Sequence, residues 1–480
     1  MTVKSKAGRG VLRRSTCFLL FCFFAVSVLC PLFVMLLHLK DADLPALIAD
    51  WSIQRATLHS LAVSLCATAI SILLATLAAW CMTRTAVRLK RIFNVCILLP
   101  MLIPSISHGM GLILLFGSNG SLTRLFGLEK GIYGFWGIVI GSVMYAFPVA
   151  YLMIADILQY EDSTPYDAAA VLGLSAPRRF WAITLPYLRK PMISVVFAVF
   201  TMIVTDYGVP LMIGGMYKTL PVLMYEEVIG GQNFAKGSFF GIILLLPAVA
   251  AFLVDLFCKS DRRGPGVAQS FRIEKKRGRD AAALVFLLLL SVCVVYPIAS
   301  FAAITFSGSY PSDLHFTLHH VVNTFRKGAG TYLVNSLLIA LATAACGTAI
   351  AFLCACFTGR ESGKSARMLH LLSILPLAVP GIVLGLSYVL FFKGSFLYQT
   401  LAILILVNTV HFFSSPYLMI YNSIGKLNPN LEATAASLTC SGVWKSGSPT
   451  PRDRAPSMVL AISKKSLIPE SGISTTTFDR

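Results

Sequence analysis

Long runs of apolar residues, separated by short polar segments, dominate the pattern of this chain. A membrane-spanning helix needs about 20 predominantly apolar residues. Because lipid cannot hydrogen-bond exposed backbone groups, runs of this length must be helical. We therefore predict an all-α, polytopic membrane protein with about ten transmembrane helices. The predicted spans are residues 15–39, 57–82, 92–116, 134–157, 191–214, 238–258, 281–306, 331–357, 367–392 and 397–422.

The composition agrees with this pattern and excludes other classes. Hydrophobic residues make up 56% of the chain and charged residues 13%, with a mean hydropathy of +0.76, whereas soluble domains carry about 25% charged residues. The net charge of +19 does not indicate nucleic acid binding, because the basic residues gather between the spans. The 12 cysteines mostly lie within spans and are interpreted as small buried apolar residues. We predict no cofactor and no metal site, since the histidines lack ligand spacing.

The distribution of Lys and Arg predicts the orientation. Cytoplasmic loops of membrane proteins carry an excess of these residues, and here basic clusters occupy alternate connecting segments. We therefore expect that the basic N-terminus, residues 1–14, is cytoplasmic. The clusters that fall on the same side are Arg84/Arg88/Lys90/Arg91, Arg178/Arg179/Arg189/Lys190 and Lys275/Lys276/Arg277/Arg279.

An internal repeat divides the chain into two parts. Residues 98–111 match residues 374–387, and the prolines of this segment, Pro100 and Pro104, recur as Pro376 and Pro380 at a common offset of 276. The repeat unit contains an even number of spans, so both repeats have the same orientation. Paired prolines within a span break the helical ladder and predict a kink at equivalent places. The predicted organisation is a first repeat at 15–258, a basic linker at 259–280, an incomplete second repeat at 281–445 and a polar tail at 446–480.

The polar segment after the fourth span carries the most specific motif. Residues 160–191 contain Asp167-Ala168-Ala169, then Gly173, then an I-x-L-P sequence that ends at Pro186. This spacing resembles the E-A-A-x(3)-G-x(9)-I-x-L-P loop of permeases in binding-protein-dependent ABC importers, with Asp in place of the first Glu. The resemblance implies that the loop couples the permease to a separate ATPase.

The residue types suit a short helix that docks on a soluble subunit. Ala168 and Ala169 offer a compact, helix-favouring surface, and Gly173 permits a turn between two short helices. Arg178 and Arg179 are expected to anchor the loop at the membrane interface. An alanine-rich surface helix that binds nothing is the alternative.

A second loop of this kind begins at residues 427–445. Glu432, Ala433 and Ala435 match the start of the motif, but no I-x-L-P follows and the segment after Lys445 lacks a long apolar run. We expect that the reading frame is disrupted near Lys445; a solvated regulatory tail is the alternative.

The resemblance covers roughly residues 15–445, and residues 205–255 are similar to fused permeases of the iron(III), 2-aminoethylphosphonate and thiamine group. It implies a bacterial inner-membrane permease that is not itself an enzyme and imports iron(III) or an organophosphonate. The implied partners are two nucleotide-binding ATPase subunits, an extracytoplasmic solute-binding protein and membrane lipid. An ion-driven secondary transporter and an inactive truncated permease are the rival hypotheses.

Three ionisable residues within predicted spans are candidates for the substrate pathway, because such groups are costly in lipid and are usually functional. Asp206 lies in the fifth span, before Gly208 and Pro210. His108 and His411 lie in the third and tenth spans. A hydrogen bond to a kinked neighbouring helix is the alternative role for either histidine.

Overall fold

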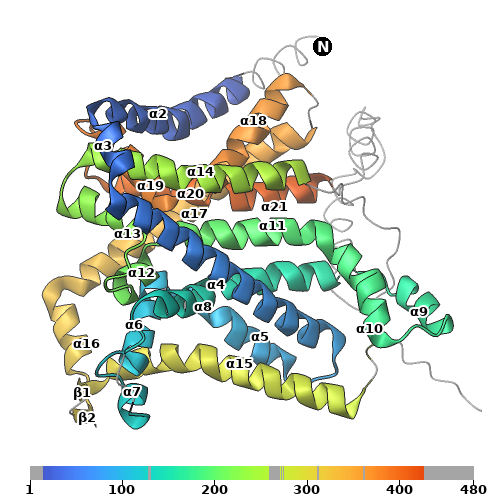
Figure 1. Cartoon of the computed structure of the whole chain (residues 1–480). Coiled ribbons are helices and arrows are strands. Elements are labelled where there is room, and N and C mark those ends of the chain that lie inside the picture. Colours follow the sequence, from blue (N-terminus) through green and yellow to red (C-terminus); the bar gives the residue numbers. More distant parts are fainter. Residues whose placement is uncertain are drawn as a thin grey trace, which may run out of the picture. The chain divides into compact units, whose positions relative to one another are not determined.

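The computed structural model describes residues 15–127, 131–159, 161–258, 271, 273, 275–310, 313–360 and 363–425. The segment Met1–Ile424 forms one compact unit, shown in Figure 1. Within the described residues, seven helices are long and apolar enough to cross a membrane, or up to ten if each bent pair counts as one span. The predicted all-α membrane fold is confirmed.

The first half of the chain, up to residue 258, contains helices only among its described residues. Its elements are η1 (Ala25–Leu29), α2 (Cys30–Leu37), η2 (His38–Asp41), α3 (Leu44–Ala49), α4 (Trp51–Arg84), α5 (Lys90–Leu98), η3 (Leu99–Leu102), α6 (Ser105–Phe116), α7 (Ser121–Leu125), α8 (Phe135–Gln159), α9 (Thr164–Val171), α10 (Ala176–Arg179), η4 (Phe180–Thr184), α11 (Leu185–Val204), α12 (Gly208–Ile213), α13 (Leu220–Tyr225), η5 (Glu226–Gly230) and α14 (Phe234–Cys258).

The second half, from residue 277 onward, repeats much of this order and adds one antiparallel hairpin, in which Ser307 pairs with Phe316. Its elements are α15 (Arg277–Ile304), β1 (Ser307–Ser309), β2 (Asp313–Phe316), α16 (His319–Thr324), η6 (Phe325–Ala329), α17 (Gly330–Arg360), α18 (Lys364–Ile374), η7 (Leu375–Ala378), α19 (Gly381–Phe392), α20 (Leu401–Phe412) and α21 (Ser414–Gly425).

The third span of each half is broken at the duplicated prolines. The helices on either side of the break meet at 106° in the first half and at 107° in the second. Pro104 and Pro380 precede α6 and α19 with extended backbone, at φ −57°, ψ 146° and φ −56°, ψ 140°. Proline fixes φ near these values and removes the donor that a continuous helix needs. The predicted kinks are therefore full breaks, and the two breaks have nearly the same angle.

The first span of each half packs on the third span of the other half. α2 contacts α19 and α14, while α15 contacts α5 and α6, as Figure 1 shows. The buried side chains form two clusters with the same exchange: one combines α4, α8 and α11 with α15, and the other combines residues 20–35 with α17 to α21. Because apolar burial stabilises both clusters, the two halves are interlocked.

Two predicted spans differ from the observed helices. The helix predicted at 191–214 extends over Phe180–Val204, because Asp206 accepts hydrogen bonds from the backbone of a new short helix, α12, and so ends the longer one. The prediction that Asp206 lies inside the fifth span is therefore wrong. The tenth span bends by 47° between α20 and α21, beside the proline at position 416.

Candidate functional site

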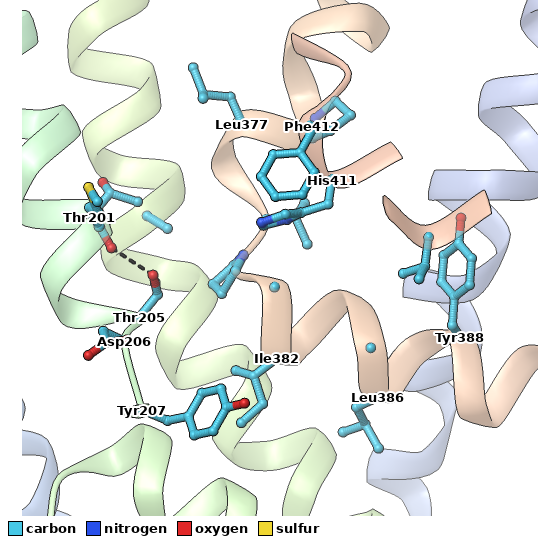
Figure 2. A pocket seen from close by; sticks show the side chains of 18 of the residues that line it. Thr201, Thr205, Asp206, Tyr207, Leu377, Ile382, Leu386, Tyr388, His411 and Phe412 are labelled. Carbon is cyan, nitrogen blue, oxygen red and sulfur yellow. Dashed lines mark hydrogen bonds between the residues drawn. The ribbon is translucent and has the colours of Figure 1, made fainter. Parts of the chain in front are cut away.

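A cavity of about 1010 Å³ lies between the two halves. Helices α8, α11, α13 and α14 line it from the first half, and η7, α19 and α20 line it from the second. Figure 2 shows residues of α11 facing His411 and the broken span η7–α19 across this space. The prolines of the second break, Pro376 and Pro380, form part of the wall. The repeat thus places its broken span at the boundary of a chamber large enough for a small solute.

The cavity lining contains one acidic side chain among the described residues. Asp206 contributes this carboxylate, and no Lys or Arg lines the space. Its oxygens accept hydrogen bonds from the backbone N–H groups of Gly208 (3.3 Å) and Val209 (3.1 Å) at the start of α12. These bonds fix the carboxylate at the end of α11, where Figure 2 shows it close to Thr205.

The two candidate histidines have different surroundings. His411 lines the cavity, and its ring lies within 3.2 Å of the position that a Cβ would take at Gly381. A larger residue than glycine at 381 would therefore crowd this imidazole. His108 is buried at 1% exposure and does not line the cavity. Of the described residues, none forms a hydrogen bond of ordinary geometry with either ring nitrogen of His108, although the imidazole approaches the backbone of Pro100 at the break of the same span.

The segment with the predicted coupling motif forms a small helical projection. Figure 1 shows α9 and α10 beyond the end of α11, away from the packed helices. Gly173 follows α9 with φ +71°, the left-handed region that glycine enters without a steric cost. Its N–H bonds the carbonyl of Ala170, and Leu174 N–H bonds that of Ala169. This is the common way in which glycine ends a helix, and it confirms the predicted turn between two short helices.

The exposed surface of α9 differs from the predicted one. Ala168 is exposed, but Ala169 is buried at 6% exposure and packs inward. The most exposed apolar side chains are instead Val171, at 90%, and Leu172, at 77%. Asp167 and Pro186 are exposed as well. The exposure of Val171 and Leu172 could have been inferred from their position directly before Gly173, which ends the helix.

The two arginines of the loop have separate environments. Arg179 donates from Nε to the carbonyl oxygen of Leu174 at 2.7 Å and so closes the turn after Gly173. Arg178 is exposed. Anchoring of the loop at the membrane interface by Arg178 and Arg179 stays a prediction.

A buried polar cluster holds the loop to α4, and the sequence analysis did not identify it. Arg84, at the end of α4, forms an ion pair with Glu161, whose side chains are 13% and 3% exposed. Tyr166 of α9 donates its hydroxyl hydrogen to Glu161 and also contacts Thr184. Burial and the hydrogen bond to Glu161 raise the pKa of the Tyr166 phenol. The cluster therefore fixes the base of α9 through a chain of polar contacts.

The linker between the halves contributes one described side chain to this cluster. The Phe271 ring lies 3.4 Å from the Arg84 guanidinium carbon, and it meets the Tyr166 ring edge-on at 4.8 Å between centroids. A cation over an aromatic face is attracted by the ring quadrupole. The loop, α4 and the linker thus meet at Arg84.

Several predictions concern residues that lie outside the described part of the chain. Glu432, Ala433 and Ala435 of the second loop belong to this group, as do residues 1–14 and the tail after 445. Within the described part, no group of three His, Cys, Asp or Glu side chains is arranged to hold a metal ion.

Comparison with known proteins finds similarity to one family of permeases over part of the chain. Residues 71–259 match the family described as "Binding-protein-dependent transport system inner membrane component". The chain is 25% identical over 380 residues to the putative ferric transport system permease protein FbpB 1 of Haemophilus influenzae, covering 76% of this chain and 60% of that protein. It is also 25% identical over 373 residues to the ferric transport system permease protein FbpB of Actinobacillus pleuropneumoniae, covering 74% and 54% respectively.

Shorter relatives and one solved structure align with parts of the chain. The molybdenum transport system permease protein ModB of Azotobacter vinelandii is 27% identical over 205 residues, 41% of this chain and 88% of that protein. A chain from the crystal structure of a bacterial alginate ABC transporter, in complex with its alginate pentasaccharide-bound periplasmic protein, aligns with a TM-score of 0.44. That alignment has 14% identity and covers 55% of this chain and 98% of the other. The chain spans 54–60% of the length of the two ferric permeases.

Proposed function

Because residues 71–259 of this chain match the inner-membrane components of binding-protein-dependent transport systems, we propose that it is the permease subunit of an ATP-driven importer. In this proposal the solute passes through the cavity between the halves, and ATP hydrolysis occurs on separate subunits. The observation that carries it is the pairing of that cavity with the exposed, glycine-terminated helix α9 at the family's motif.

The coupling contact is proposed to lie on α9. Val171 and Leu172 are exposed apolar side chains on a short helix that the Arg84–Glu161 cluster holds at its base. A helix of this kind fits a hydrophobic groove on a partner. Asp167, Ala168 and Gly173 contribute the surrounding surface, and Glu432, Ala433 and Ala435 are proposed to supply the second contact. Ala169 is proposed to stabilise α9 from within rather than to touch the partner.

The transported solute is proposed to be a cation, iron(III) in the first place. Three of the curated relatives are named as ferric or Fe(3+) permeases, and others as molybdenum, sulfate or spermidine/putrescine permeases. The described cavity lining holds one carboxylate and no Lys or Arg. A negative charge in a site of low dielectric attracts cations and repels oxyanions. This charge balance favours iron(III) over an organophosphonate, which was the second predicted cargo.

The proposed partners are two ATPase subunits on the cytoplasmic face and an extracytoplasmic binding protein that delivers the solute. The N-terminus is proposed to be cytoplasmic, since the basic clusters and α9 then lie on the same side as the ATPase. An ion-driven secondary transporter remains the rival, and an inactive permease is the second one. Co-purification of an ATPase subunit with the chain supports the importer, whereas solute uptake driven by an ion gradient alone supports the secondary transporter.

Substitution of Gly173 tests the coupling contact. Gly173→Asp places a negative charge at the C-terminal end of α9, where the helix dipole disfavours it, on the surface proposed to dock. We expect loss of ATP-dependent iron(III) uptake with unchanged membrane insertion. Gly173→Asn is the matched control, because asparagine also tolerates the left-handed conformation and adds no charge; it should retain most of the uptake. Normal uptake by Gly173→Asp would contradict the assignment.

A further inference from the structure

Two tyrosine hydrogen bonds occupy equivalent places in the two halves. In the first half, Tyr151 of α8 donates its hydroxyl hydrogen to Asn94 Oδ1 at 2.8 Å. In the second, the hydroxyl of Tyr417 on α21 lies 2.5 Å from His370 Nδ1. Asn94 and His370 are 276 positions apart, the offset of the duplicated prolines. Tyr151 and Tyr417 are 266 positions apart, the offset that aligns Leu172 with Leu438 in the two coupling motifs.

The cavity lining supports this second offset independently. Tyr145 and Val149 of α8 line the cavity from the first half, and His411 and Ser415, each 266 positions further along, line it from the second. The two tyrosines lie a short way beyond these positions on each helix. Both are buried, Tyr151 at 3% exposure and Tyr417 at 0%. A buried hydroxyl that loses its partner incurs a desolvation cost, so these contacts constrain where the helices lie.

Each hydrogen bond joins two elements with distinct tasks. Asn94 and His370 lie on α5 and α18, the arms of the broken spans that lead into the breaks η3 and η7. Tyr151 and Tyr417 lie on the helices that directly precede the two coupling motifs. In the second half the connection is doubled, because Ser414 donates to the carbonyl oxygens of Ser373 (3.0 Å) and Ile374 (3.3 Å) at the end of α18. Each helix that precedes a coupling motif is therefore hydrogen-bonded to the arm of a broken span.

We propose that Asn94–Tyr151 and His370–Tyr417 are matched positioning contacts that transmit movement of each coupling loop to the broken span at the cavity wall. The proposal rests on the proposed function, since it names the internal link between loop and cavity. The side chains do not touch the solute; they act through η3 and η7. Coupling through such a link requires an element with two arrangements, whose equilibrium is shifted both by the coupling loop and by the cavity. In this proposal the breaks at Pro100–Pro104 and Pro376–Pro380 are that element.

The difference between Asn94 and His370 provides the experiment. The full chain is reconstituted in lipid vesicles with the ATPase and binding protein from its own organism, and iron(III) accumulated per ATP hydrolysed is measured. Tyr151→Phe, Tyr417→Phe and His370→Leu should each lower this ratio by roughly 5-fold, the lower end of common coupling factors. His370→Asn, which copies the first half's contact, should retain at least about half of the wild-type ratio.

The control removes a comparable hydroxyl elsewhere. Tyr310 donates to the carbonyl oxygen of Leu114 at 2.7 Å, near the end of α6 that is far from the break, and Tyr310→Phe should leave the ratio unchanged. A wild-type ratio in Tyr417→Phe and His370→Leu would overturn the proposal. An equal decrease of the ratio in His370→Asn and His370→Leu would overturn it too. The decrease would then follow from loss of the imidazole's packing and not from loss of its hydrogen bond to Tyr417.

A second measurement separates this proposal from the proposed function. If the wild-type vesicles show no ATP-driven iron(III) uptake, the proposed function fails, and amide hydrogen exchange of the full chain in lipid nanodiscs tests the link. Tyr417→Phe should raise exchange across 364–380, and Tyr151→Phe should raise it across 90–105, several-fold above the wild type. Unchanged exchange in both segments would overturn the positioning contacts themselves.

Discussion

Helices α4 and α17 are equivalent elements of the repeat, yet they have different neighbours. In the most apolar 18-residue window of each span, 39% of the residues are buried in the span formed by α4 and 17% in the span that contains α17. Ser60 of α4 is buried and accepts a hydrogen bond from Leu220 N–H at 2.8 Å. Its counterpart Ser336 is exposed and donates only to Tyr332 of its own helix.

The cause of this difference lies in the elements that cover α4. In the first half α11 and α13 pack on it, and among the described residues of the second half no element follows α21. The C-terminal parts of the two helices are alike, because Ala75 and Ala351 are both fully buried. The comparison teaches that a repeated sequence sets the helix and its break, while the neighbouring spans decide which face is buried.

The largest expected effect comes from breaking the cluster that holds the first coupling loop. Glu161→Gln leaves the buried Arg84 without its ion-pair partner, and removal of one partner of a buried pair costs about 3–5 kcal/mol. We expect the free energy of local opening of residues 160–184 to fall by that order, measured by amide hydrogen exchange. Glu226→Gln is the matched control, because its pair with Lys218 is exposed, 46% and 42%, and such pairs contribute about 0–1 kcal/mol. Equal effects of both substitutions would contradict the bracing role of Glu161.

The equivalent serines test the difference between α4 and α17 directly. Ser60→Ala removes the acceptor of the buried Leu220 N–H and should lower the free energy of unfolding by about 1–3 kcal/mol. Ser336→Ala removes an exposed hydroxyl and should change it by less than about 0.5 kcal/mol. Both are measured in mixed detergent micelles. If Ser336→Ala destabilised the protein as much as Ser60→Ala, the outer part of α17 would be covered as α4 is.

The smallest effect should be shared by the two halves. Pro104 and Pro380 have nearly the same backbone angles, so Pro→Ala at each site mainly enlarges the unfolded ensemble. Each substitution should cost about 0.4–1 kcal/mol, and the two values should agree within about 0.5 kcal/mol. A cost at one site several times that at the other would show that the two breaks are not equivalent.

The sequence predicted the elements that depend on local pattern. Most of the spans, the equivalent breaks and the turn at Gly173 follow from apolar runs, prolines and glycine spacing, and the structure contains them. The angle of the breaks did not follow, because Pro100 and Pro376 predict a disrupted ladder but not the packing that bends it. Asp206 was misplaced because an apolar run continues on both sides of the residue that ends the helix.

Contacts between distant segments could not be predicted. Arg84 and Glu161 are 77 positions apart, and Phe271 approaches them from the linker. One sequence shows each residue but not the register in which two helices meet. The burial of Ala169 was missed for a related reason: the alanine run of α9 is uniform, so the face that packs inward depends on how Tyr166 anchors the helix.

ATP-driven uptake of radioactive iron(III) tests the central claim most directly. Vesicles would contain the chain, its ATPase and its binding protein, with Asp206→Asn as the variant that removes the charge from the cavity lining. We expect iron(III) to accumulate only with ATP, to be unaffected by collapse of ion gradients, and to fall at least roughly tenfold in Asp206→Asn, which corresponds to about 1.4 kcal/mol. Accumulation driven by an ion gradient without ATP, or uptake of molybdate in place of iron(III), would contradict the proposed cation importer.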